Sequence, residues 1–222
     1  MITFRKLRAD EIECRVARCF ETANGVGCMC LLYKDARCDM NILDETVGPE
    51  SWQRKHELVN GNLFCSVGIY TERVAYSEWV WKQDVGTESN TEKEKGQASD
   101  SFKRACVNWG IGRELYTAPD IVFWAGEFSV GKNKKPDDRF IVTDIKYDGN
   151  RIKSVTIMSA KTEKSKTFET NSRENVLRAM IRKAHFSEKS VLEHFEKNSL
   201  ADLTPEEEGE LLHKCKGASN GN

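Results

Sequence analysis

The sequence predicts a mixed fold in which hairpin-connected strands and helices are followed by a helical carboxyl-terminal stretch. Two observations carry this expectation. Apolar runs are bordered by turn residues, which is typical of strand hairpins. Asn60-Gly61 precedes the run 63–70, and Asp148-Gly149 follows the run 140–147. Apolar residues at helical spacing recur between these runs and again after residue 170. We divide the chain into a core over 1–170, a helical extension over 171–218 and a disordered tail over 219–222.

Five segments of the core are predicted in order. Ile12, Val16, Cys19 and Phe20 have helical spacing, so we expect a short helix over 10–20. A turn at 24–27 precedes a brief apolar run over 28–33, which fits a strand or the start of a helix. The spacing of Ala36, Met40, Leu43 and Val47 predicts a helix over 35–47 that Gly48-Pro49 ends. Strands are expected over 63–70 and 79–86.

The clearest helix covers 91–109. Thr91 followed by Glu94 forms a capping box, and Gly110 suits the position after the last turn. Three further strands are expected, listed here by range: 121–125, 140–147 and 152–158. Helices are expected over 171–184 and 190–195, and Thr204-Pro205 begins another.

Composition excludes several classes of function. The chain has 222 residues, with 34 Lys plus Arg against 35 Asp plus Glu, so its net charge is −1. A uniformly basic protein that coats nucleic acid is excluded, and any anion site must gather its cations locally. No apolar stretch approaches the ~20 residues that span a bilayer, and the charged amino-terminal segment is unlike a signal peptide. We therefore expect a soluble intracellular protein without a membrane partner.

The eight cysteines are expected to be free thiols. Cys28-x-Cys30 and Cys38 lack the repeated C-x₂₋₄-C pairs of structural zinc, so no metal is predicted, although whether these thiols ever bind one stays open. The histidines show no H-E-x-x-H spacing and no G-x-S-x-G motif is present. No catalytic residue and no cofactor is predicted.

One motif offers an enzymatic alternative. Gly126 to Lys132 fits the first seven positions of a phosphate-cradling loop of a nucleotide hydrolase. Asn133 stands where the magnesium-binding hydroxyl is needed, and Pro136 argues against the helix that must follow. A basic hairpin loop is the alternative reading of the same residues, and a protein-interaction module using the carboxyl-terminal helices is a third possibility for the chain.

The helix over 91–109 carries basic residues beside a narrow apolar stripe. Lys95, Ser99 and Lys103 are spaced by four, and Arg104 lies on another flank. Small residues keep this part of the helix slim, so a phosphate backbone could approach closely. A solvated charged face explains the same spacing. Tyr33 and Trp52 are candidates for base stacking, with a core or rim position as the alternative for each. Arg54-Lys55 forms a short basic cluster that solvation alone also explains.

Three motifs in order resemble the Rad-fifty-two superfamily of single-strand annealing proteins, particularly its short bacteriophage members. They are Tyr33-x₃-Arg37-x₅-Leu43-x-Glu45-x₂-Gly48-x₃-Trp52, then Gln83-Asp84-Val85-Gly86, then the helix from Glu92 to Gly110 with Lys103-Arg104. The resemblance covers about residues 10–118. It implies an α+β fold, a strand meander packed on helices, assembled as a ring or helical homo-oligomer.

The resemblance also implies a function and its residues. The protein would bind single-stranded DNA in an outer groove and anneal complementary strands without ATP, in phage recombination or repair within the bacterial cytoplasm. Lys103 and Arg104 match phosphate-gripping positions, Tyr33 matches a groove aromatic, and Arg15 is the counterpart of a third groove residue. Lys95, Arg37 and Lys55 complete the expected DNA-binding set. The family's further Arg is Val107 here. The carboxyl-terminal helices would dock a partner such as the host single-strand-binding protein.

Overall fold

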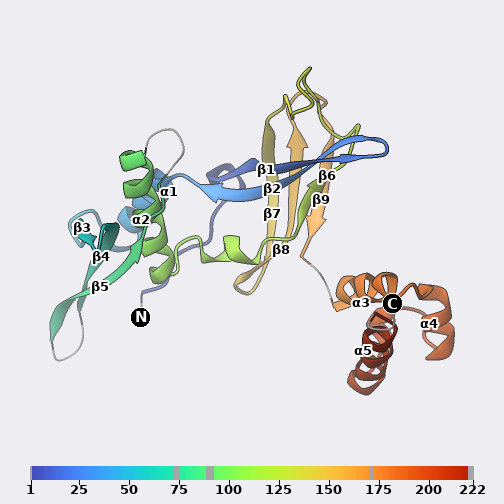
Figure 1. Ribbon diagram of the computed structural model, residues 1–222. Helices are drawn as coiled ribbons and strands as arrows, with labels where there is room; N and C mark the ends of the chain where they lie inside the picture. The colour runs from blue at the N-terminus through green and yellow to red at the C-terminus, as the bar shows by residue number, and fades with distance from the viewer. Residues whose placement is uncertain (1, 73–75, 89–92, 171–172, 220–222) are drawn as a thin grey trace. The chain divides into compact units, whose positions relative to one another are not determined.

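The computed structural model describes residues 2–72, 76–88, 93–170 and 173–219 (Figure 1). It confirms the α+β class, with antiparallel sheets and a helical carboxyl-terminal part. Two compact units divide the chain, Met1–Phe168 and Glu169–Asn222. Each unit has its own apolar core, and each is described by itself below.

The larger sheet of the first unit has six strands in the order β6-β2-β1-β7-β8-β9. Its registers are antiparallel between β1 and β2, β1 and β7, β2 and β6, and β7 and β8. The strands are β1 (Ile12–Thr22), β2 (Gly25–Lys34), β6 (Ile121–Phe123), β7 (Phe140–Asp148), β8 (Arg151–Ser159) and β9 (Ser165–Glu169).

The predicted helix over 10–20 is wrong, because these residues form β1. Ile12 and Cys14 are buried and alternate with the less buried Glu13 and Arg15, as in a half-buried strand. The register then shifts between Val16 and Arg18, where Ala17 is an extra residue in a β-bulge. The bulge shifts the alternation by one position, so Cys19 rather than Arg18 lies opposite the buried Cys28. Because the alternation changes at the bulge, the apolar residues of β1 fall at a spacing that resembles that of a helix.

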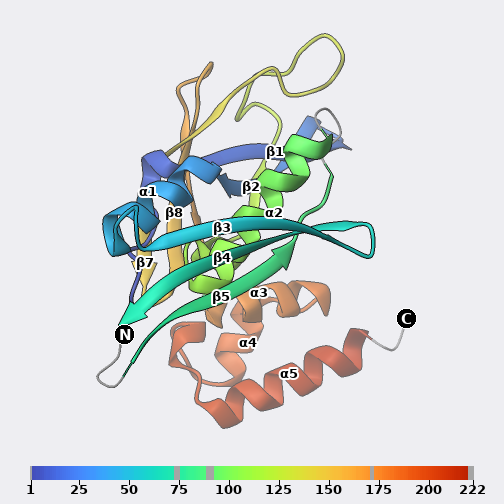
Figure 2. The same cartoon turned by 90° about the vertical axis from the view of Figure 1, so that its left-hand side faces the viewer.

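The smaller sheet is a meander of β3 (Trp52–Val59), β4 (Asn62–Glu72) and β5 (Ser77–Val85), with α2 (Lys93–Trp109) packed across one face. Figure 2 looks onto the three strands with α2 behind them. Phe102, Ala105 and Cys106 of α2 are fully buried against β4 residues that include Val67 and Ile69. The predicted strands over 63–70 and 79–86 are confirmed as β4 and β5. Thr91 of the predicted capping box lies outside the described residues.

Helix α1 (Ala36–Val47) confirms the predicted helix over 35–47. Asp35 is its N-cap and accepts a hydrogen bond from the backbone N–H of Arg37. Gly48 ends it with φ 88°, a conformation that favours glycine. Ile42 and Leu43 on its inner face are fully buried, so α1 belongs to the core that α2 also enters.

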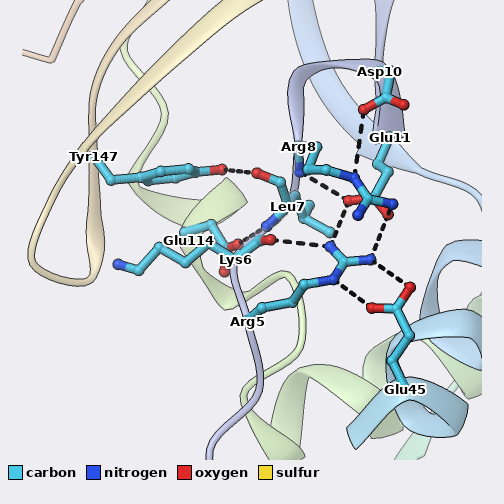
Figure 3. A network of polar contacts seen from close by, with 9 residues as sticks. All are labelled: Arg5, Lys6, Leu7, Arg8, Asp10, Glu11, Glu45, Glu114 and Tyr147. Atoms are coloured by element: carbon cyan, nitrogen blue, oxygen red, sulfur yellow. Dashed lines mark hydrogen bonds and ion pairs between the residues drawn. The ribbon is translucent and has the colours of Figure 1, made fainter.

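The amino-terminal segment is fastened to three other parts of the first unit (Figure 3). Arg5 donates to Glu11 at 2.7 and 2.8 Å and to Glu45 of α1 at 2.6 Å. The backbone N–H of Leu7 donates to the buried carboxylate of Glu114 at 2.9 Å, and the Tyr147 hydroxyl of β7 donates to the Leu7 carbonyl at 2.8 Å. We call the Arg5–Glu11–Glu45 group the amino-terminal clasp.

The second unit consists of α3 (Arg173–Lys183), α4 (Glu188–His194) and α5 (Pro205–Ser219). All three predicted carboxyl-terminal helices are therefore confirmed. Its own core contains Leu177, Ile181, Leu203 and Leu211. Helix α5 includes Ser219, and residues 220–222 of the predicted tail lie outside the described residues.

Candidate nucleic-acid interface

A groove of about 480 Å³ runs between β2 and α2. We call it the β2–α2 groove. One wall is the β2 segment 29–34, and the other is α2 with the loop that follows it. The residues lining it from outside β2 are Thr87, Asp100, Lys103, Arg104, Val107, Gly112, Leu115, Tyr116, Ala118, Pro119, Asp120 and Ile121.

The groove brings together side chains that are 70 residues apart in the sequence. Tyr33 comes from β2, and Lys103 and Arg104 come from the middle of α2. Arg15 of β1 joins them, because its guanidinium lies 5.5 Å from the centre of the Tyr33 ring. Four of the seven predicted DNA-binding residues therefore lie in or beside one groove. The remaining three lie elsewhere.

The cations of the groove differ in how far their charge is compensated. Arg104 shares its charge with Asp84 of β5, at 3.3 Å, and Arg15 is ion-paired with its neighbour Glu13. No ion pair is recorded for Lys103 within the described residues. The acidic lining residue Asp100 already accepts two hydrogen bonds from Thr87, at 3.0 and 3.1 Å. Lys103 is therefore the cation most available to an incoming anion.

A buried ion pair lies beneath the groove. Lys34, at the end of β2, contacts Asp39 of α1, and the two side chains are 4% and 0% exposed. Burial raises the pKa of the Asp39 carboxyl to about 6, even though the positive charges of Lys34 and Lys103 act against this shift. The second oxygen of Asp39 has no hydrogen-bond partner in the described structure. The pair ties the larger sheet to α1 at the cost of two buried charges.

Gly112 makes room for this pair at the turn after α2. Its φ of 69° is left-handed, and a Cβ there would overlap the aliphatic stem of Lys34. Glycine therefore meets two requirements at this position, the turn itself and the passage of the Lys34 side chain. Neither Lys34 nor Gly112 was predicted as part of the site, because only the fold brings them together.

The other three predicted DNA-binding residues do not line the groove. Arg37 is 83% exposed and pairs with Asp35 at 3.4 Å. Lys95 lies on α2 eight residues before Lys103, about 12 Å along the helix. Lys55 of β3 projects from the face of the small sheet opposite α2, where it lies 5.2 Å from the Trp81 ring centre and 3.5 Å from Glu57. Their role in binding stays a prediction.

Several residues of the quoted motifs have structural contacts in this fold. Trp52 stacks on Phe102 of α2 with ring centres 6.1 Å apart, and its Nε1 donates to Asp44 at 2.6 Å. Asp84 holds Arg104, and Glu45 belongs to the amino-terminal clasp. Trp52 is thus a partly buried rim residue of the core, and its candidacy for base stacking is not supported by its position.

The Gly126–Lys132 segment lacks the structure that a phosphate-cradling loop needs. It forms a tight loop in which Val130 pairs with Pro136 and the backbone N–H of Gly131 donates to Lys135 at 2.8 Å. The chain then enters β7 at Phe140 with no helix between. A helix N-terminus facing the phosphates is therefore missing, and the basic hairpin loop is the correct reading.

The cysteines are free thiols, and all but Cys19 are buried. Hydrogen bonding from Cys14 and burial together raise the pKa of Cys30 to about 12, and burial raises the pKa of Cys65 to about 11. Among the described residues, no group of three or more His, Cys, Asp or Glu side chains is arranged to hold a metal ion. None of the described helices is long and apolar enough to cross a membrane.

Comparisons with known proteins give one partial match. The chain is 35% identical over 91 residues to the single-stranded DNA-binding protein DdrA of Deinococcus radiodurans. The match covers 40% of this chain and 41% of that protein. No family model and no solved structure matches the chain. Membership of the Rad-fifty-two superfamily therefore stays a prediction, and what the comparison shows is a distant similarity to a protein named for binding single-stranded DNA.

Proposed function

We propose that this protein binds single-stranded DNA in the β2–α2 groove and anneals complementary strands without ATP. The observation that carries the proposal is the convergence of Lys103 and Arg104 of α2 with Tyr33 of β2 and Arg15 of β1. Proteins that bind single strands without sequence preference use cations to contact the phosphates and aromatic rings to stack on the bases. This groove contains both. The partial similarity to a single-stranded DNA-binding protein supports the same class of ligand.

The charge balance of the groove suits a reversible grip. Of its cations, Lys34 is paired with Asp39 and Arg104 with Asp84, and the lining also contains Asp100 and Asp120, so its charge is close to balanced. One such groove would hold a strand weakly. A homo-oligomer, a ring or a helical filament, would repeat the groove along a strand and raise the affinity through many contacts. We propose this assembly, and recombination or repair in a phage-infected bacterium as its setting.

The second unit is proposed to dock a partner such as the host's single-strand-binding protein. Val176 of α3 and Phe186 after it are large apolar side chains that are 46% and 40% exposed. A direct check is whether residues 1–168 still bind an oligonucleotide but no longer bind that partner.

The groove is tested by removing its cations. Lys103→Ala is the sharper change, because Arg104→Ala also removes the cation that is ion-paired with Asp84. Each lost phosphate contact is expected to lower the slope of log K against log salt by roughly 0.7. Fluorescence anisotropy with a labelled oligothymidine over a range of sodium chloride measures the slope. Lys132→Ala, which removes an exposed cation from the 126–132 loop, is the matched control.

The same variants separate binding from nucleotide hydrolysis. We expect no ATP turnover with or without DNA, and wild-type annealing by Lys132→Ala. Unchanged DNA affinity and salt slope in a folded Lys103→Ala/Arg104→Ala protein would contradict the groove as the binding site. ATP turnover that Lys132→Ala abolishes would instead favour the hydrolase.

A further inference from the structure

The β-bulge in β1 places two arginines on one face of the larger sheet. In a regular strand, residues three apart point to opposite faces. Here Arg15 is opposite Leu31 and Arg18 is opposite Met29, because Ala17 is the extra residue between them. Leu31 and Met29 are two apart on β2 and share a face. Arg15 and Arg18 therefore lie on that face too, which a bulge-free strand would not allow.

This face of β6, β2 and β1 is the open one, and we call it the hairpin outer face. Leu31 and Tyr33 are exposed on it, while Cys28 and Cys30 alternate with them and point into the core. The face is continuous with the β2–α2 groove, since Met29, Leu31 and Tyr33 line that groove. A strand leaving the groove along β2 would therefore pass Arg15 and then Arg18.

An aromatic pair lies at the far end of the same face. Phe20 is opposite Gly27, and a Cβ at Gly27 would overlap the Phe20 ring, so the ring lies against the backbone there. Trp124, which directly follows β6, meets Phe20 edge to face with ring centres 5.6 Å apart. The indole is 51% exposed. An exposed indole held by a neighbouring ring is a suitable surface for base stacking.

The charge of Arg18 is available to a ligand. Within the described residues no ion pair is recorded for it, whereas Arg15 pairs with Glu13, and Glu21 pairs with Lys134 at 3.2 Å. The face therefore carries a net positive charge between two aromatic positions, Tyr33 and Trp124. From Tyr33 to Gly27 the β2 strand spans roughly 20 Å.

We propose that the single-stranded DNA path extends from the β2–α2 groove along the hairpin outer face, with Arg18 as a phosphate contact and Trp124 as a base-stacking residue. The inference rests on the proposed function and adds a second segment to its binding site. The positive charge and the continuity with the groove favour a polyanion over a second copy of the chain, although apolar Leu31 and Ile141 are also exposed on this face.

The test compares Arg18→Ala and Trp124→Ala with Lys153→Ala, which removes an exposed cation from β8, two strands from β1 in the sheet order. Anisotropy titrations use labelled oligothymidines of increasing length. We expect Arg18→Ala to lower the salt slope by roughly 0.7, and Arg18→Lys to keep it. Trp124→Ala should weaken binding about ten-fold with an unchanged slope. Both effects should fade with oligonucleotides too short to leave the groove.

The outcomes separate the two proposals. If Lys103→Ala lowers the slope while Arg18→Ala and Trp124→Ala match Lys153→Ala, the extension is wrong and the groove stands. If wild-type protein does not bind oligothymidine at low salt, the proposed function itself fails. If Trp124→Ala changes the sedimentation coefficient but not the DNA affinity, the face joins copies of the chain and the extension is overturned.

Discussion

Each of the two sheets has one open face. The two faces differ in whether neighbouring side chains already compensate the charge of their basic residues. On the small sheet, Tyr70, Trp79 and Trp81 form a ladder with ring centres 5.6 and 6.0 Å apart, and Lys55 is held over Trp81 and beside Glu57. On the hairpin outer face, Arg18 has no recorded ion pair within the described residues. Exposed basic residues are thus not equivalent, because neighbours have already neutralised some of them.

Two polar contacts join α1 to other parts of the first unit. On one side the buried Lys34–Asp39 pair connects β2 to α1, and on the other the amino-terminal clasp connects Arg5 to Glu45 of α1. The first contact is inaccessible to solvent and the second is partly exposed. Substitutions that break these two contacts should lower the free energy of unfolding, the buried pair more than the clasp. Removing the cation Lys55 from the open face of the small sheet should have the smallest effect, on DNA binding.

The largest effect is expected from Lys34→Met. It leaves the Asp39 carboxylate buried without a counter-charge, which typically lowers the free energy of unfolding by about 3–5 kcal/mol. The double variant Lys34→Met/Asp39→Leu should recover most of this loss, since no charge is then buried. Urea denaturation followed by circular dichroism measures both. A double variant as unstable as Lys34→Met would mean that packing of the Lys34 stem matters more than charge.

The pH dependence follows from the Asp39 pKa. Its folded value of about 6 lies above the ordinary value of about 3.9, so folding disfavours the ionised form. For this group the free energy of unfolding therefore falls as pH rises from about 4 to 6 and is constant above. In Lys34→Met the loss should be smaller at pH 5 than at pH 7.5, because the carboxyl can take up a proton.

A smaller effect of opposite pH sign is expected from Glu11→Gln. Hydrogen bonds from Arg5 lower the pKa of Glu11, so its stabilisation is present at neutral pH and is lost as pH falls through the lowered folded pKa. We expect a loss of about 1–3 kcal/mol at pH 7, because Arg5 loses its charged partner. The difference from wild type should shrink below about pH 4.5. A difference from wild type that does not shrink at all as pH falls below 4.5 would contradict the electrostatic origin.

The smallest effect is expected from Lys55→Ala in DNA binding. Because Lys55 faces away from α2 and is already engaged by Glu57 and Trp81, the salt slope should change by much less than the roughly 0.7 expected for Lys103→Ala. The same anisotropy titration applies. A full loss of one phosphate contact would show that the small sheet also touches DNA and that the two open faces act together.

The elements that sequence could predict are those with one clear period and a marked end. The helix over 35–47 has Asp35 and Gly48 at its ends, and the strand over 63–70 follows the recognisable turn at Asn60-Gly61. β1 was missed because Ala17 breaks its alternation. β3 was missed because it is exposed on nearly every residue, which removes the hydrophobic signal of a strand.

The candidate site was predicted only in part, for a related reason. Lys103, Arg104 and Tyr33 were named from local motifs and a resemblance, yet only the packing of β2 against α2 places them in one groove. Lys34 has no local signal, since its burial depends on Asp39 and on the turn after α2. Arg18 becomes relevant only once the register of β1 against β2 is known.

The glycine at position 112 has a consequence for which sequences this fold can accept. Any side chain there would strain the left-handed turn and overlap the Lys34 stem. A single methyl group would therefore displace the Lys34 ammonium from the Asp39 carboxylate. Replacing that residue is therefore tolerable only together with a shorter, uncharged pair at 34 and 39. Residues 34, 39 and 112 should therefore change together in related sequences.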